Sequence, residues 1–178
     1  MAEHTSDMLL RAQWLSAPAA LAPAPHSLLL SWLTEPGLLT RRLKAACPNR
    51  FRLEVLPGDA SLLREVALCC GDQRCIYAAT EAPVATLAAH PWLQSLGAAS
   101  LGETLNQRAA EHGVTVVRSA FSFAHFGPTG LPAGLLAPAA EAWARRSQFL
   151  LDGAALTVTE VFLPALLDHE QGRLRAAG

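Results

Sequence analysis

Alternating apolar and polar residues near the C-terminal end predict a β-hairpin. The runs "AWARRSQFLL" (142–151) and "AALTVTEVFLP" (154–164) read as strands, and Asp152-Gly153 stands between them. Asp-Gly between two apolar runs is a strong short-range hairpin signal. Successive strand side chains point to opposite faces. One face of the second run therefore carries Leu156, Val158, Glu160 and Phe162, so that Glu160 is a lone carboxylate on an apolar face.

A second predicted hairpin carries a charge of the opposite sign in the same situation. Residues 62–83 read as two strands around a Gly71-Asp72 turn. In its first strand Arg64 shares a face with Leu62, Val66, Leu68 and Cys70. Because a guanidinium stays charged in proteins, a buried Arg64 must meet an anion, which can be a protein carboxylate or a ligand.

Ordinary ion pairs would also explain both charges. If Asp152-Gly153 is a two-residue turn, counting back places Arg145 opposite Glu160, and such a cross-strand pair neutralises a strand carboxylate. Arg64 could similarly pair with Glu81 or Glu65. From the pattern alone, structural ion pairs and a ligand site both remain open.

The rest of the chain predicts an α+β fold: one domain over residues 1–178, with an antiparallel sheet and helices on one side. Residues 1–26 are expected to form an N-terminal arm, and residues 168–178 a frayed tail. Ser27 is a plausible helix N-cap. Pro36-Gly37 separates two short helices, which are expected to form a compact hairpin able to cover another part of the protein. The remaining expected elements are strands at 50–58 and 114–126, helices at 84–97 and 100–113, and a loop at 127–140.

Composition narrows the class of protein. With 51% hydrophobic and 16% charged residues, the chain should be globular with a real core. A formal charge of −1 argues against a nucleic-acid or anionic-membrane binder. No run approaches the roughly 20 apolar residues of a membrane span, and the first residues lack a signal-peptide pattern, so a cytoplasmic location is expected.

The sequence offers little support for a metal or a cofactor. Its cysteines, Cys47, Cys69, Cys70 and Cys75, do not have zinc-ribbon spacing, and no histidine cluster completes them. We interpret them as small core residues in a reducing compartment. Dinucleotide, P-loop and zinc motifs are absent, so no cofactor is expected.

Several segments, read in order, resemble the chorismate pyruvate-lyase family over roughly residues 12–167. They are Arg64-Glu65-Val66-Ala67-Leu68-Cys69, the Gly71-Asp72 turn, Pro83-Val84-Ala85-Thr86-Leu87, Ser100-Leu101-Gly102, Arg145-Arg146-Ser147 and Thr159-Glu160-Val161-Phe162-Leu163-Pro164. The order and joint presence of these segments are fairly specific.

The resemblance implies a fold and a reaction. The fold is an antiparallel sheet with a buried ligand cavity beneath helix-turn-helix flaps. The reaction removes pyruvate from chorismate to give 4-hydroxybenzoate for ubiquinone synthesis, without a cofactor. The implied partners are therefore chorismate and 4-hydroxybenzoate, in a monomer that binds no nucleic acid.

The resemblance also implies a role for four residues. Arg64 matches the arginine that clamps the ring carboxylate, and Glu160 matches the glutamate that reaches the opposite end of the ring. We expect Glu160 to act at the ether oxygen as a general acid or base, or to orient the departing group. The backbones of Leu39 and Leu101 are expected to contact the ligand from the two flaps.

The chain departs from the family pattern at Ala79, where members carry an arginine thought to help hold the enolpyruvyl side. Either another cation, Arg145 or Arg118, takes that role, or the activity is weaker or differently directed. The alternative function is that of a non-catalytic, effector-sensing domain of similar fold that binds small carboxylates.

Overall fold

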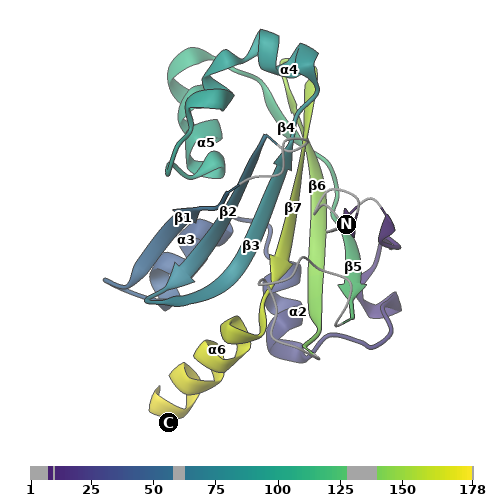
Figure 1. Cartoon of the computed structure of the whole chain (residues 1–178), viewed down its shortest axis with the longest axis vertical. Coiled ribbons are helices and arrows are strands. Elements are labelled where there is room, and N and C mark those ends of the chain that lie inside the picture. Colours follow the sequence, from purple (N-terminus) through teal and green to yellow (C-terminus); the bar gives the residue numbers. More distant parts are fainter. Residues whose placement is uncertain (1–7, 10, 58–62, 128–139, 178) are drawn as a thin grey trace.

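The computed structural model describes residues 8–9, 11–57, 63–127 and 140–177. In this part of the chain a seven-stranded antiparallel sheet has the order β1-β2-β3-β7-β6-β4, and β5 also pairs with β6 (Figure 1). This confirms the predicted α+β class. The strands are β1 Phe51–Val55, β2 Arg64–Cys70, β3 Gln73–Glu81, β4 Val116–Arg118, β5 Ser122–Phe126, β6 Ala142–Leu151 and β7 Ala154–Phe162.

Both predicted hairpins are present. Asp152 and Gly153 have φ angles of 49° and 89°, and Leu151 pairs with Ala154. Two positive φ angles give the turn a twist that matches the strands, which explains the Asp-Gly pair. Strands β3 and β7 then lie side by side and join the two hairpins into one sheet.

The predicted long strand at 114–126 is interrupted. Arg118 pairs with Phe149, whereas Ser122 pairs with Arg146. From Arg118 to Ser122 the chain advances by four residues, whereas the paired stretch of β6, from Phe149 to Arg146, advances by three. The extra residue breaks the ladder between β4 and β5. Ser119 fills part of the gap, because its hydroxyl accepts a bond from the backbone N–H of Gln148 at 2.9 Å.

The helices form two groups at the sheet. Figure 1 shows α4 and α5 beyond one end of the sheet, with α2 and α3 behind it. The first helix is capped by His26 rather than by Ser27, since the His26 ring accepts a bond from the N–H of Leu28. The bounds are η1 Pro18–Ala20, α2 Ser27–Leu33, α3 Leu39–Ala46, α4 Val84–Ala89, η2 Pro91–Ser95, α5 Leu101–His112 and α6 Pro164–Ala177.

Both faces of the sheet are covered. Two apolar clusters lie on the face that carries Leu68, Val158 and Phe162, and they include residues of α2, α3 and α5. The opposite face carries Tyr77 and Val161, which pack with Leu9 and other residues of the N-terminal segment. Leu15 also forms a β-bridge with Phe123, so that the described part of the arm is attached to the sheet.

The frayed tail expected from Asp168 onward is corrected by the structure. Residues 164–177 form α6, in which Leu166 and Glu170 are buried. His169 contacts the carbonyl of Ala46 at 3.0 Å. The prediction was wrong because these contacts are made to distant parts of the chain and leave no local pattern. In the described part, no helix has the length and hydrophobicity that crossing a bilayer requires.

The prediction of four reduced core cysteines is also corrected. Cys47, at the end of α3, and Cys70, at the end of β2, form a disulfide, while Cys69 and Cys75 are free and buried. All four do lie in the core. The disulfide joins the helical layer to the sheet.

Candidate functional site

A cavity lies between the sheet and the helices. Its space measures about 630 Å³, including the part that opens to solvent. Strand residues form its floor, and the starts of α3 and α5 form its cover. The residues that matter most to its chemistry are Arg64, Arg118, Glu160, Leu39, Leu101 and Gly102.

Arg64 supplies positive charge to one part of the cavity. Its Nη2 donates to the carbonyls of Gly97 and Ala99 at 2.6 and 2.7 Å, just before α5. Its Nε is buried without a hydrogen-bond partner. Burial lowers the pKa of the guanidinium. Since none of the described carboxylates pairs with Arg64, the cation remains available to an anionic ligand.

The alternative partners considered for Arg64 lie elsewhere. Glu65 is on the opposite face of β2 and accepts a short hydrogen bond from the Tyr77 hydroxyl. Glu81 lies near Arg146, whose charge partly offsets the rise in the Glu81 pKa that burial causes. The structural ion-pair interpretation therefore does not hold for Arg64 among the described residues.

Two helix N-termini meet at the cavity. The α3 helix begins at Leu39 and the α5 helix at Leu101, and both residues line the cavity. The first backbone N–H groups of a helix have no partner within the helix and carry partial positive charge. Together with Arg64, these helix starts form surroundings suited to a carboxylate.

The two covers of the cavity touch each other. We call residues 27–46, which contain α2 and α3, the first flap, and residues 91–112, which contain η2 and α5, the second flap. The Ser100 hydroxyl donates to the Thr40 hydroxyl at 3.1 Å. Gly102 has no side chain to keep Leu38 away, and a Cβ there would lie 2.5 Å from Leu38 Cδ2. The flaps therefore close over the cavity in direct contact.

Glu160 provides the negative charge of the cavity. It lies on β7 opposite Arg145 of β6, and Arg145 Nε donates to Glu160 Oε2 at 2.6 Å. The sequence predicted this pairing from the turn length, and the structure confirms it. Both interpretations of Glu160 therefore apply, because the paired carboxylate also faces the cavity.

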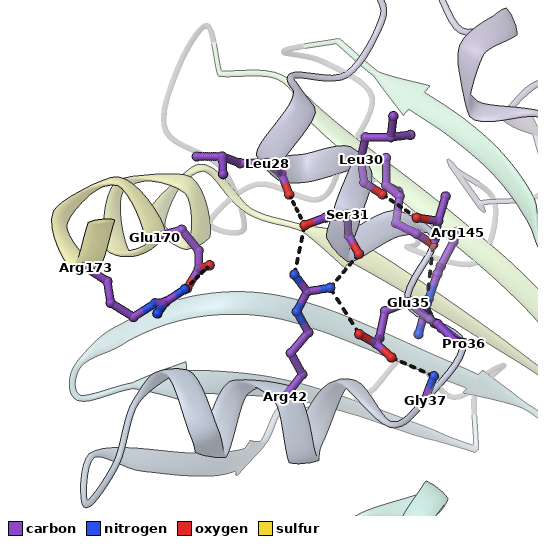
Figure 2. A network of polar contacts seen from close by, with 12 residues as sticks. Leu28, Leu30, Ser31, Glu35, Pro36, Gly37, Arg42, Arg145, Glu170 and Arg173 are labelled. Atoms are coloured by element: carbon purple, nitrogen blue, oxygen red, sulfur yellow. Dashed lines mark hydrogen bonds and ion pairs between the residues drawn. The ribbon is translucent and has the colours of Figure 1, made fainter. Parts of the chain in front are cut away.

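Arg145 connects Glu160 to the first flap. Its side chain is fully buried, and its Nη1 donates to the carbonyls of Leu33 and Glu35. Figure 2 shows Arg145 beside the turn between α2 and α3, where the Glu35 carboxylate bonds to the Gly37 N–H and to Arg42. Because one guanidinium holds both the carboxylate and the flap turn, the position of Glu160 is tied to the closed flap.

A second guanidinium reaches Glu160 from β4. Arg118 Nη2 lies 3.6 Å from Glu160 Oε2. Its Nε donates to the Ser147 hydroxyl at 3.0 Å. The guanidinium carbon lies over two aromatic rings, 4.3 Å from the centroid of Phe121 and 5.0 Å from that of Phe149. Arg118 is thus held through its Nε and by its contacts with the two rings, and it lines the cavity.

Ala79 does not face the cavity. Its neighbours Ala78 and Thr80 line the cavity, whereas Ala79 is buried in the cluster on the opposite face of the sheet. Of the two cations expected to compensate for it, Arg118 lines the cavity and Arg145 lies beside it, bonded to Glu160.

The structure brings all four predicted site residues, Arg64, Glu160, Leu39 and Leu101, to one cavity. Their roles toward a ligand stay predictions. Sequence reasoning named Arg118 only as a substitute for a missing cation. Its place depends on the interruption between β4 and β5, for which the sequence has no clear signal.

Comparisons with known proteins agree with this geometry. Residues 54–172 match the family model described as chorismate lyase. A "probable chorismate pyruvate-lyase" of Pseudomonas aeruginosa (strain UCBPP-PA14) is 32% identical over 177 residues, covering 89% of this chain and 94% of the relative.

Two further relatives have similar coverage. A "probable chorismate pyruvate-lyase" of Methylococcus capsulatus is 35% identical, covering 77% of this chain and 95% of the relative. A "chorismate pyruvate-lyase" of Erwinia tasmaniensis is 32% identical, covering 93% of each.

Proposed function

The chain belongs to the chorismate lyase family, and on this premise we propose that it converts chorismate into 4-hydroxybenzoate and pyruvate. The observation that carries the proposal is that Arg64 and Glu160, from separate hairpins, face one cavity. The 4-hydroxybenzoate would then enter ubiquinone synthesis.

The reaction is an elimination whose driving force lies in the substrate. Chorismate is a dianion with one carboxylate on the ring and one on an enolpyruvyl ether. The C–O bond from the ring to the ether oxygen breaks, the neighbouring ring carbon, which bears the hydroxyl, loses its hydrogen as a proton, and the ring becomes aromatic. The departing enolate takes up a proton and becomes pyruvate. One dianion thus gives two monoanions.

Arg64 binds the ring carboxylate in this proposal. A guanidinium can bind a carboxylate through two parallel hydrogen bonds, and these charge-assisted bonds are about twice as strong as neutral ones. The N-termini of α3 and α5, at Leu39 and Leu101, add backbone N–H groups from the flaps. The substrate is thereby fixed at one end, which orients the ring.

Glu160 acts at the other end of the ring. Two guanidinium groups lie beside its carboxylate: Arg145 Nε is 2.6 Å and Arg118 Nη2 is 3.6 Å from Glu160 Oε2. A charged carboxylate is suited to accept the hydroxyl hydrogen bond and the ring proton. We therefore assign Glu160 the role of base and orienting group, with Arg145 as the residue that positions it.

The flaps exclude water from the reaction. Contact between Gly102 and Leu38, and between Ser100 and Thr40, joins the two flaps over part of the cavity. In a water-poor site, fixed charges stabilise the transition state more strongly than they would in water. All of these groups come from one chain, which supports the expectation of an active monomer.

The proposal is tested with purified protein and chorismate. We expect 4-hydroxybenzoate, followed by chromatography, and pyruvate, followed with a coupled dehydrogenase, in equal amounts. The rate should be unchanged after desalting into a chelator, because no cofactor is proposed. Tight binding of 4-hydroxybenzoate with no product from chorismate would overturn the proposal and favour a non-catalytic binding domain.

A further inference from the structure

The cavity holds more positive charge than one carboxylate requires. Among the described residues, three guanidinium groups, those of Arg64, Arg118 and Arg145, lie at or beside it, together with the one carboxylate of Glu160. Three positive charges and one negative charge leave two positive charges. Because uncompensated charge in a partly buried site is costly, this balance favours a ligand that carries two negative charges.

The charge of Glu160 is already matched by Arg145. Their 2.6 Å bond is short, and Arg145 itself is fully buried and is not among the residues that line the cavity. Its Nη1 is occupied by two flap carbonyls. Arg145 is thus bonded to the protein through Nε and Nη1, while its Nη2 is buried without a hydrogen-bond partner among the residues that the structure describes; the guanidinium groups that line the cavity itself are those of Arg64 and Arg118.

Arg118 has one close hydrogen bond, at Nε, and only long contacts to the described part of the chain at its two outer nitrogens. Its Nε donates to Ser147, and its guanidinium carbon contacts the Phe121 and Phe149 rings. Its outer nitrogens, in contrast, make long contacts: 3.5 Å from Nη1 to the Pro36 carbonyl and 3.6 Å from Nη2 to Glu160. Burial also lowers the pKa of this guanidinium, which a bound anion would oppose.

We propose that Arg118 is a specificity-determining residue, which binds the second carboxylate of a dicarboxylate ligand while Arg64 binds the first. This inference rests on the proposed function and deepens it, because it names the residue that distinguishes the dianionic substrate from its monoanionic aromatic product. Arg64 selects a ring carboxylate, and Arg118 selects the side chain to be removed.

The test measures the binding of two stable probes of the same ring layout. The dianion is 3-(carboxymethoxy)benzoate, which carries a ring carboxylate and an ether-linked carboxylate. The monoanion is 3-methoxybenzoate, which lacks the second carboxylate. Calorimetry on the wild type should show tighter binding of the dianion. Equal affinity for both probes would overturn the inference.

Substitution then assigns the preference to one residue. Arg118→Gln should raise Kd for the dianion about tenfold or more and change Kd for the monoanion less than about twofold. Arg64→Gln should weaken both. The matched control is Arg108→Gln, because Arg108 also stacks on an aromatic ring, 4.9 Å from the Trp92 centroid, and does not line the cavity. It should change neither Kd.

The outcomes separate this inference from the proposed function. Equal weakening of both probes by Arg118→Gln, or no weakening, overturns the role of Arg118 even if the wild type turns over chorismate. Conversely, binding of the two probes requires no turnover, so the probe test would still decide the role of Arg118 if the wild type did not convert chorismate. If Arg118→Gln does not fold, Arg118→Lys is measured instead, because lysine keeps the positive charge. This variant should bind the dianion more tightly than the monoanion, but by a smaller factor than the wild type. A preference that is lost, or that is equal to that of the wild type, would overturn the inference.

Discussion

Arg145 and Glu160 face each other across β6 and β7, and their side chains form a 2.6 Å bond beside the cavity, which Glu160 lines. The same guanidinium holds the carbonyls of Leu33 and Glu35 in the first flap. The pair is therefore both a structural ion pair and part of the candidate site.

Arg145→Gln should destabilise the fold by about 3 kcal/mol, because it leaves a mostly buried carboxylate and two carbonyls without their partner. Glu160→Gln should also destabilise, since it leaves Arg145 without an anion. Urea denaturation should show that the double variant costs less than the sum of the two single variants.

The exposed Lys44–Glu103 pair between the flaps is the control for this cycle. Lys44→Gln should cost less than about 1 kcal/mol, because solvent screens an exposed pair. Additive costs at Arg145 and Glu160 would show that the two residues do not act together.

Glu160→Gln should lower kcat for chorismate by about 100-fold or more if Glu160 is the base. The amide keeps the size of the carboxylate, so binding of 4-hydroxybenzoate should change much less. The matched control is Glu54→Gln, because Glu54 is also a strand glutamate that bonds to two arginines, Arg52 and Arg74, but does not line the cavity. Similar losses of kcat in both variants would remove Glu160 from the mechanism.

The parts of this site that the sequence predicts are those set by local geometry. The Asp152-Gly153 turn fixes the register of β6 and β7, and that register places Arg145 opposite Glu160. Strand alternation likewise places Arg64 with Val66 and Leu68 on the cavity face.

The parts that the sequence does not predict depend on contacts between distant segments. Cys47 and Cys70 are 23 residues apart, and they meet because the pairing of β1 with β2 places Phe51 opposite Cys70 and the end of α3 lies just before β1. The tail becomes helical where Leu166 and Glu170 find buried places. Arg118 turns toward Glu160 beside an interruption that neither alternation nor turn residues reveal.

Gly102→Ala should weaken substrate binding several-fold by separating the flaps. The new Cβ would lie 2.5 Å from Leu38 Cδ2, so the Leu38 side chain must shift at the cavity wall. Steady-state kinetics should show a higher KM with a smaller change in kcat. Adding Leu38→Ala should recover part of the loss, because it removes the clashing atoms; the absence of any recovery would show that the clash is not the cause. The control is Ala110→Ser, on the exposed surface of α5, which should leave KM unchanged. Gly113→Ala is not used because Gly113 has a φ angle of 67°, which would strain an alanine.

The two free cysteines should be unreactive in the folded protein. Burial raises the pKa of the Cys75 thiol to about 11 and also raises that of Cys69. A raised pKa leaves less reactive thiolate at pH 8 than an ordinary thiol has. A thiol reagent at pH 8 should therefore label neither cysteine quickly, and both only after unfolding. Fast labelling of the native protein would contradict the burial of these thiols.

Reduction of the Cys47–Cys70 disulfide should destabilise the protein by about 3 kcal/mol, because the bond restricts the unfolded chain over a 23-residue separation. Thermal melts with and without a phosphine reductant measure the effect, and unfolded protein should show two thiols before reduction and four after it. Cys47→Ser is the matched control: its melting temperature should be close to that of the reduced wild type and should not respond to the reductant. Four thiols without reduction would show that the bond does not form in solution, and the first flap would then be held to the sheet by packing and hydrogen bonds alone.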